Sequence, residues 1–230
     1  MFHRSFRTLL ACALAALTAA TAALAVTGSS PDGDAHPYVG ALVVDGAVQC
    51  SGVLIAPTVF ATAGHCGTEG ARVAVALDSD LNDGWSLLEG TLKVDPAKKA
   101  DLAVVVLDRP APVAPAALPK EGAVDGLAKR SPVTSVGYGY SSRAADGSFV
   151  YDGRRRRAES PLQKASKLSL TISTREAGPC LGDSGGPQLV GDTVLSLTSA
   201  GSKDCSGTAD GYRVDSAPAR AFLAAFVRLP

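Results

Sequence analysis

The stretch Cys180-Leu-Gly-Asp-Ser-Gly-Gly-Pro187 places the strongest structural constraint on this 230-residue sequence. Three glycines, a proline and a cysteine surround one serine, and this composition forces a tight turn that larger residues do not permit. Ser184 lies at the apex of that turn. Because a serine hydroxyl is a weak nucleophile at neutral pH, it is useful for chemistry only if a base elsewhere accepts its proton. The alternative is a glycine-rich loop with a polar turn residue.

The composition is that of a folded, exported protein. Hydrophobic residues make up 46% of the chain and charged residues 19%, which is enough for a sizeable core in one or two domains. Arg4 and Arg7 precede an apolar run over 9–24 that ends in Ala23-Leu24-Ala25. This order predicts a secretory signal peptide over residues 1–25, with a membrane anchor or lipidation at Cys12 as alternatives.

The charge balance gives no reason to expect nucleic acid or an anionic membrane as a partner. Residues 1–25 contain two arginines and no acids, so their removal leaves 20 basic against 22 acidic side chains, a formal charge of −2. Nothing in this balance favours nucleic acid or an anionic membrane. We expect a secreted monomer without stable membrane association after signal cleavage.

Four cysteines remain once Cys12 is removed: Cys50, Cys66, Cys180 and Cys205. An even count in an exported chain predicts two disulfides, for which sequence alone allows three pairings. Cys50 with Cys66 and Cys180 with Cys205 are the local choices, and each would stabilise the fold by about 3 kcal/mol on a chain-entropy estimate. A zinc site is the competing use, but the sequence has no Cys-x-x-Cys pair.

Short apolar runs separated by turn signals predict antiparallel β-structure in two units. The runs 38–44 and 48–55 flank Asp45-Gly46, which is a strong hairpin signal. The segment 111–119 contains three prolines and predicts an extended crossover between the units. Further runs lie at 59–63, 73–77, 85–94 and 102–107 before the crossover, and at 133–138, 164–172, 188–190, 194–198 and 212–214 after it.

The last element is predicted to be a helix. Ser216 can cap it, and Pro218 then falls in its first turn. Phe222 and Phe226 are one turn apart, which places both on a core-facing side.

The search for a general base is short because only His36 and His65 follow the signal peptide. Histidine can accept and return a proton near neutrality. His65 lies in Thr62-Ala63-Gly64-His65-Cys66, after a predicted strand and beside a cysteine that can be anchored, whereas His36 precedes Pro37 in a loop. We predict that His65 is the base.

The acid that orients this base should lie at the edge of buried structure. Asp101 opens the apolar run Asp101-Leu-Ala-Val-Val-Val-Leu107 and fits that requirement. There it would keep the imidazole in one tautomer and stabilise the imidazolium. Asp95, before a proline turn, and Asp108, at the far end of the strand, are the alternatives.

These segments, together with Gly182-Asp183-Ser184-Gly185-Gly186-Pro187, resemble the trypsin and chymotrypsin family of serine endopeptidases. The chain order His, Asp, Ser is that of the family and differs from the subtilisin and α/β-hydrolase orders. The resemblance covers the mature chain and implies an all-β, chymotrypsin-like fold of two six-stranded antiparallel barrels with a C-terminal helix. His65 and Asp101 would lie in an N-terminal barrel (26–118) and Ser184 in a C-terminal barrel (119–230).

The resemblance also implies a mechanism, a pocket and partners. The backbone N–H groups of Gly182 and Ser184 would stabilise the oxyanion. The primary substrate pocket would have Gly178 and Pro179 as its floor and Ser199-Ala200-Gly201 as one wall, with Asp210 projecting from the opposite side. Because no carboxylate occupies the floor, basic and apolar preferences both remain open. A protein or peptide substrate, proteinaceous inhibitors and no cofactor are implied.

In the family, the carboxylate beside the nucleophile pairs with a buried N-terminal ammonium. This chain has no Arg or Lys followed by Ile-Val-Gly-Gly, but signal cleavage after Ala25 would expose Val26. We therefore hypothesise that Val26 and Asp183 form the activating pair. The alternative is that backbone donors or another base satisfy Asp183.

Two further stretches need an explanation. Asp78-x-Asp80-x-Asn82, followed by Glu89, offers the oxygen ligands of a calcium loop, but Asp83 replaces the required glycine, so no metal site is predicted and a structural calcium is an alternative. The run Arg154 to Arg157 predicts a solvated loop, with proteolytic nicking or an acidic partner as alternatives.

The competing hypotheses for function are an inactive protease homologue that serves as a binding module, and an esterase. Such homologues usually lose a catalytic residue, whereas this chain keeps all three and the oxyanion glycine.

Overall fold

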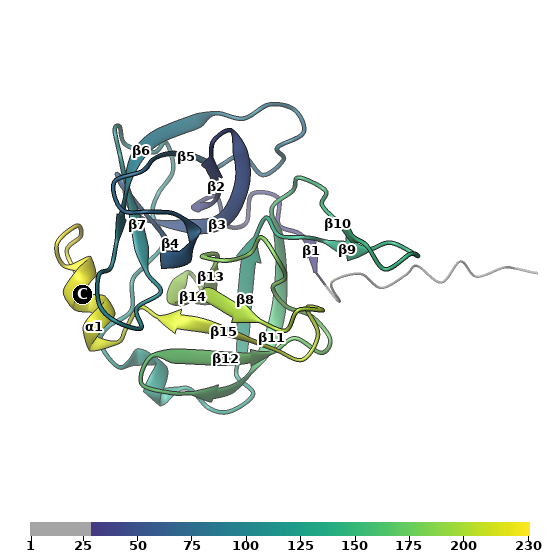
Figure 1. Cartoon of the computed structure of the whole chain (residues 1–230). Helices are drawn as coiled ribbons and strands as arrows, with labels where there is room; N and C mark the ends of the chain where they lie inside the picture. Colours follow the sequence, from purple (N-terminus) through teal and green to yellow (C-terminus); the bar gives the residue numbers. More distant parts are fainter. Residues whose placement is uncertain (1–28) are drawn as a thin grey trace, which may run out of the picture.

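Two antiparallel β-barrels lie side by side, and a short helix follows them near the end of the chain (Figure 1). The computed structural model describes residues 29–230. The predicted signal peptide and Val26 therefore lie outside the described residues. The predicted chymotrypsin-like fold class, with two closed six-stranded barrels and a C-terminal helix, is confirmed.

The first barrel closes in the order β2-β3-β4-β7-β6-β5. Its hairpin between β2 and β3 turns at Asp45-Gly46, where both residues have positive φ, as the two-residue hairpin turn requires. Its strands are β2 (Val39–Val44), β3 (Ala47–Ala56), β4 (Val59–Thr62), β5 (Arg72–Ala76), β6 (Leu87–Val94) and β7 (Ala103–Leu107).

The second barrel closes because β11 pairs with both β12 and β8. The short strand β1 (Ser30–Pro31) is added at β11, and β9 (Ser142–Arg143) pairs with β10 (Phe149–Val150) in a separate hairpin. The barrel strands are β8 (Pro132–Gly137), β11 (Arg156–Ala165), β12 (Ser169–Ser173), β13 (Pro187–Val190), β14 (Thr193–Gly201) and β15 (Thr208–Arg213).

The predicted single strand over 164–172 is wrong, because it spans the turn between β11 and β12. The backbone reverses there, and the Ser166 N–H donates to the Ser169 carbonyl oxygen at 2.8 Å. Most of β11 was missed because its outward residues are charged or polar. Its buried inward positions are Ala158, Ser160 and Leu162, of which two are apolar.

The C-terminal helix α1 (Ala217–Leu223) has its proline in the first turn, as predicted. Ser216 takes the N-cap backbone conformation, but its hydroxyl donates to the Arg213 carbonyl oxygen at 2.9 Å instead of accepting from the helix. The predicted side-chain cap is therefore wrong. Phe222 and Phe226 pack against the core with ring centroids 5.1 Å apart. Within residues 29–230, no helix has the length and apolar character needed to cross a bilayer.

One large apolar core runs through the first barrel and into the second. It joins first-barrel residues such as Phe60 and Leu92 to second-barrel residues such as Leu189 and Leu197, all fully buried. A smaller cluster around Val133 and Ile172 fills the rest of the second barrel. Because the core is continuous across the seam, the loops that meet there are held in fixed positions.

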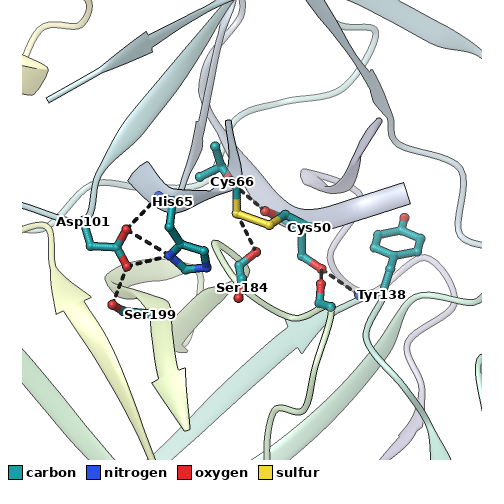
Figure 2. The surroundings of a disulfide bond; sticks show 10 residues. Cys50, His65, Cys66, Asp101, Tyr138, Ser184 and Ser199 are labelled. Atoms are coloured by element: carbon teal, nitrogen blue, oxygen red, sulfur yellow. Dashed lines mark hydrogen bonds and ion pairs between the residues drawn. A yellow bond between two sulfur atoms is a disulfide. The ribbon is translucent and has the colours of Figure 1, made fainter. Parts of the chain in front are cut away.

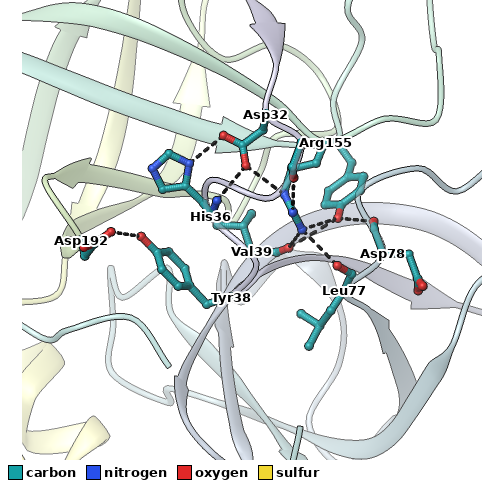
Figure 3. A network of polar contacts seen from close by, with 10 residues as sticks. Asp32, His36, Tyr38, Val39, Leu77, Asp78, Arg155 and Asp192 are labelled. Atoms are coloured by element: carbon teal, nitrogen blue, oxygen red, sulfur yellow. Dashed lines mark hydrogen bonds and ion pairs between the residues drawn. The ribbon is translucent and has the colours of Figure 1, made fainter. Parts of the chain in front are cut away.

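The arginine run does not form the predicted solvated loop. Arg155 is only 1% exposed and makes a buried ion pair with Asp32, Nε to Oδ2 at 3.1 Å (Figure 3). Its guanidinium also donates to the carbonyl oxygens of Gly33, Val39 and Leu77 at 2.5, 3.0 and 3.0 Å. A buried guanidinium is tolerated only when its donors are satisfied in this way.

The neighbouring arginines are paired at the surface. Arg154 Nε contacts Asp80 Oδ2 at 2.9 Å, and Arg156 Nη1 contacts Asp152 Oδ2 at 2.8 Å. The Asn82 N–H and amide group also donate to Asp80. Protein donors therefore already engage a carboxylate of the candidate calcium loop.

Candidate active site

His65 and Asp101 come together at one edge of the first barrel (Figure 2). His65 lies in the 3-10 turn η1 (Gly64–Cys66) that follows β4, and Asp101 lies just before β7. The His65 Nδ1 is 3.0 Å from both carboxylate oxygens of Asp101, and the His65 backbone N–H donates to Oδ1 at 3.0 Å. The turn is anchored by the disulfide Cys50–Cys66.

The second barrel also holds this carboxylate, because the Ser199 hydroxyl on β14 donates to Asp101 Oδ2. Burial disfavours the charged carboxylate, but the hydrogen bonds from His65 and Ser199 prevail and lower the pKa of Asp101. The hydrogen bond that His65 donates to Asp101 in turn raises the pKa of His65 despite its partial burial. Asp101 is therefore ionised at neutral pH and holds the proton of neutral His65 on Nδ1, which leaves Nε2 free as a base.

Ser184 lies on the other side of the imidazole. In Figure 2 the ring of His65 stands between Asp101 and Ser184. The Ser184 carbonyl oxygen accepts from the Ser51 N–H of the first barrel at 2.9 Å. Gly185 has φ +79°, and a Cβ there would lie 2.2 Å from Thr62 Oγ1. Only glycine lets the turn approach the strand that leads to His65 so closely.

The N–H groups of Gly182 and Ser184 are oriented by hydrogen bonds to the carbonyl oxygens of the same peptide units. The Leu181 carbonyl oxygen accepts from the Tyr140 N–H at 2.9 Å, and the Asp183 carbonyl oxygen accepts from the Gly186 N–H at 2.9 Å. Because the C=O and N–H of a trans peptide point in opposite directions, the N–H groups of Gly182 and Ser184 face the other way. In the described part of the chain, neither donates to another protein group.

The Asp183 carboxylate is held by backbone donors. It accepts from the Gly139 N–H at 2.7 Å and the Cys180 N–H at 2.8 Å, and it leaves no room for a Cβ at Gly139. Burial raises the pKa of Asp183 to about 6, and the two backbone hydrogen bonds offset part of that effect. Within residues 29–230 it has no ion-pair partner. It lines a cavity of about 20 Å³ together with Ser29, the first described residue.

A second cavity, of about 160 Å³, opens beside Ser184. It is lined by Pro179, Cys180, Leu181, Ser184, Thr198, Ser199, Ala200, Gly201, Ser202 and Ala209, none of which is charged. Four of the six predicted pocket residues thus lie together here. The disulfide Cys180–Cys205 joins the nucleophile turn to the loop before β15.

Gly178 and Asp210 are not among the residues that line this cavity, so their place in the substrate pocket stays a prediction. Gly178 lines the small cavity beside Asp183, as Pro179 also does. Asp210 follows Ala209 on β15, and successive residues of a strand point to opposite faces. Its carboxylate instead accepts from Thr171 Oγ1 on the neighbouring strand β12.

Sequence reasoning missed Ser199 as a partner of Asp101 and Ser51 as a partner of the nucleophile turn. Nothing in the local sequence marks either serine, because both contacts join residues from different barrels. His65 also lies near the sulfurs of Cys50 and Cys66. These sulfurs are joined in a disulfide and cannot bind a metal as thiolates.

Comparisons with known proteins agree with this geometry. The family profile described as Trypsin matches residues 25–220. A protein described as Trypsin from Saccharopolyspora erythraea is 28% identical over 200 residues, which cover 76% of this chain and 86% of that relative. Among solved structures, HL collagenase superposes with a TM-score of 0.72 at 17% identity, covering 88% of this chain and 99% of the other. The Vibrio cholerae VesB protease superposes with a TM-score of 0.69 at 19% identity, covering 86% of this chain and 66% of the other.

Proposed function

This chain belongs to the trypsin family, and we propose that it is a secreted serine endopeptidase that acts through Ser184, His65 and Asp101. Family membership supports a serine peptidase. The observation that carries the finer assignment is the imidazole of His65, which is fixed by Asp101 at Nδ1 and stands between that carboxylate and Ser184.

In the proposed reaction, the Ser184 Oγ bonds to the carbonyl carbon of a peptide while its proton passes to the Nε2 of His65. The carbonyl oxygen becomes an oxyanion that accepts hydrogen bonds from the N–H groups of Gly182 and Ser184. When the C–N bond breaks, the leaving amine takes the proton from His65 and an ester remains on Ser184. Water then attacks that ester, gives one proton to His65, and the collapse returns it to Ser184.

The substrate is proposed to be a protein or peptide with an uncharged residue before the scissile bond. The cavity beside Ser184 has no charged side chain in its lining, and Asp210 faces Thr171 instead. A basic side chain would find no counter-ion there.

The activating pair of Val26 and Asp183 remains a proposal. Ser29 lines the cavity beside the Asp183 carboxylate, and three residues of extended chain span at most about 10 Å. An ammonium at Val26 is therefore within reach of a carboxylate that has backbone donors but no cation in the described part of the chain. N-terminal sequencing of fully active protein that starts far from Val26 would exclude the pair.

Export and physical state are proposed on the same basis. Cleavage after Ala25 would release a mature chain with an N-terminal barrel (26–118) and a C-terminal barrel with the helix (119–230). Two disulfides are compatible with an oxidising compartment. We expect a monomer that proteinaceous inhibitors block and that has no stable membrane association.

A fluorophosphonate probe tests the assignment directly. We expect one adduct at Ser184, its loss in Ser184→Ala, and hydrolysis of unmodified peptide bonds that disappears in the same variant. A folded protein that neither labels nor cleaves would support the inactive homologue instead. Cleavage of esters without peptides would indicate an esterase.

A further inference from the structure

Ser51 links the first barrel to the nucleophile turn through two separate donors. It lies on β3 directly after Cys50 and is 0% exposed. Its backbone N–H donates to the Ser184 carbonyl oxygen at 2.9 Å, and its hydroxyl donates to the Gly182 carbonyl oxygen at 3.0 Å. One residue of the first barrel thus holds the carbonyls of both residues whose N–H groups face the proposed oxyanion.

The Ser51 hydroxyl is itself fixed from a third direction. It accepts from the Tyr138 backbone N–H at 2.9 Å, and the next N–H, that of Gly139, donates to Asp183. The Ser51 carbonyl oxygen accepts from Thr62 Oγ1 at 2.8 Å. Each polar group of Ser51 therefore has a protein partner.

The space around this side chain is closed. A Cβ at Gly137 would lie 2.8 Å from the Ser51 hydroxyl, and a Cβ at Gly186 would lie 3.2 Å from the Ser51 Cβ. The nucleophile turn, in contrast, contains three glycines, and both Gly182 and Gly185 have positive φ. Such a backbone has many accessible conformations, so external hydrogen bonds must select one.

We propose that Ser51 is a positioning residue that fixes the two oxyanion donors before substrate binds; this inference rests on the proposed peptidase function. Preorganised donors stabilise a developing charge because they need not reorient during the reaction. Without the Ser51 hydroxyl, the Gly182 carbonyl loses its anchor. The peptide unit between Gly182 and Asp183, which connects the two donor peptides, can then rotate and change the directions of both N–H groups. Ground-state binding in the cavity beside Ser184 does not involve this hydroxyl.

The test compares Ser51→Ala with Ser196→Ala in the full mature enzyme. Ser196 is also 0% exposed, and its hydroxyl donates to Gln188 Oε1 at 2.6 Å inside the second barrel, so it is a matched buried deletion. For Ser51→Ala we expect kcat to fall by about 10- to 100-fold, with KM changed by less than about twofold. The rate constant for fluorophosphonate labelling should fall by the same factor, because that adduct also places an oxygen against the donors. Ser196→Ala should keep wild-type kcat and labelling.

Each outcome is decisive when activities are normalised to folded protein, measured by near-ultraviolet circular dichroism. Wild-type protein that neither labels nor cleaves would refute the proposed peptidase function itself. Active wild type with undiminished kcat in Ser51→Ala, or an equal loss in Ser196→Ala, would overturn only the role of Ser51. If Ser51→Ala does not fold, Ser51→Gly replaces it. The same fall in kcat is expected for Ser51→Gly, and an undiminished kcat would again contradict the role of Ser51.

Discussion

The Ser199 hydroxyl donates a hydrogen bond to Asp101 Oδ2 and so joins β14 of the second barrel to the carboxylate that orients His65. A hydrogen bond to a charged group contributes roughly 1.5–3 kcal/mol. We therefore predict that Ser199→Ala lowers kcat by about tenfold, since 1.4 kcal/mol corresponds to that factor. Steady-state kinetics on a cleaved peptide would measure it, and an unchanged kcat would show that the bond does not support the imidazole.

The pH dependence should follow His65. Its Nε2 accepts a proton only when the ring is neutral, so activity should rise with pH through the pKa of His65. The hydrogen bond from His65 to Asp101 raises this pKa, which places the midpoint above the ordinary value of about 6.5. Asp101→Asn should move the midpoint to lower pH and reduce kcat by about 10⁴-fold, as in other Ser-His-Asp enzymes. A profile that is flat from about pH 4 to 9 would contradict this role.

The pH dependence of the free energy of unfolding should show whether an N-terminal ammonium pairs with the Asp183 carboxyl. Without a cation, its pKa of about 6 lies above the unfolded value, so the unfolded chain releases its proton first. The free energy of unfolding should then decrease as pH rises from about 4 to about 6. An ammonium at Val26 would remove this decrease.

The comparison uses protein that begins at Val26 and protein with two extra residues before it. Urea unfolding at pH 4.5 and 6.5 should show the decrease in the extended form only. Identical curves would indicate that Val26 does not pair with Asp183. Groups that behave alike in the two forms cancel in the comparison, so the difference between the forms isolates Asp183.

Neighbouring arginines should differ sharply in their effect on stability. Arg155→Ala removes the guanidinium from the buried Asp32 carboxylate and leaves His36 as its side-chain partner. Loss of one partner of a buried pair costs about 3–5 kcal/mol. Arg154→Ala removes an ion pair in which the arginine side chain is 54% exposed, and solvent screening leaves such pairs little effect on stability. Urea unfolding of both variants would measure the contrast, and equal losses would contradict the distinction between buried and exposed sites.

Substrate preference should not depend on Asp210. Because its carboxylate accepts a hydrogen bond from Thr171 and is not among the groups that line the cavity beside Ser184, Asp210→Asn should leave the proposed preference for an uncharged residue unchanged. A peptide-library cleavage profile would test both statements. Strong cleavage after Lys or Arg that Asp210→Asn abolishes would reverse them.

The sequence predicts local features better than contacts between distant segments. Asp45-Gly46 and the turn around Ser184 are governed by glycine conformation, which is readable in the residues themselves. The inward side of Ala209 and the outward side of Asp210 depend on strand register, and a shift of one residue exchanges the two faces. The burial of Arg155 follows from partners up to 123 residues away, so its charge alone predicts the opposite.

The groups that would carry out hydrolysis are divided between the barrels, with His65 and Asp101 on one and Ser184 and Ser199 on the other. Gly185 lies at the contact between the two barrels, where a single added methyl group would overlap Thr62. The catalytic rate should therefore depend on the relative position of the two barrels. Either barrel produced alone should show no hydrolysis. A small displacement of one barrel against the other should abolish activity, although the strand pairing within each barrel is unchanged.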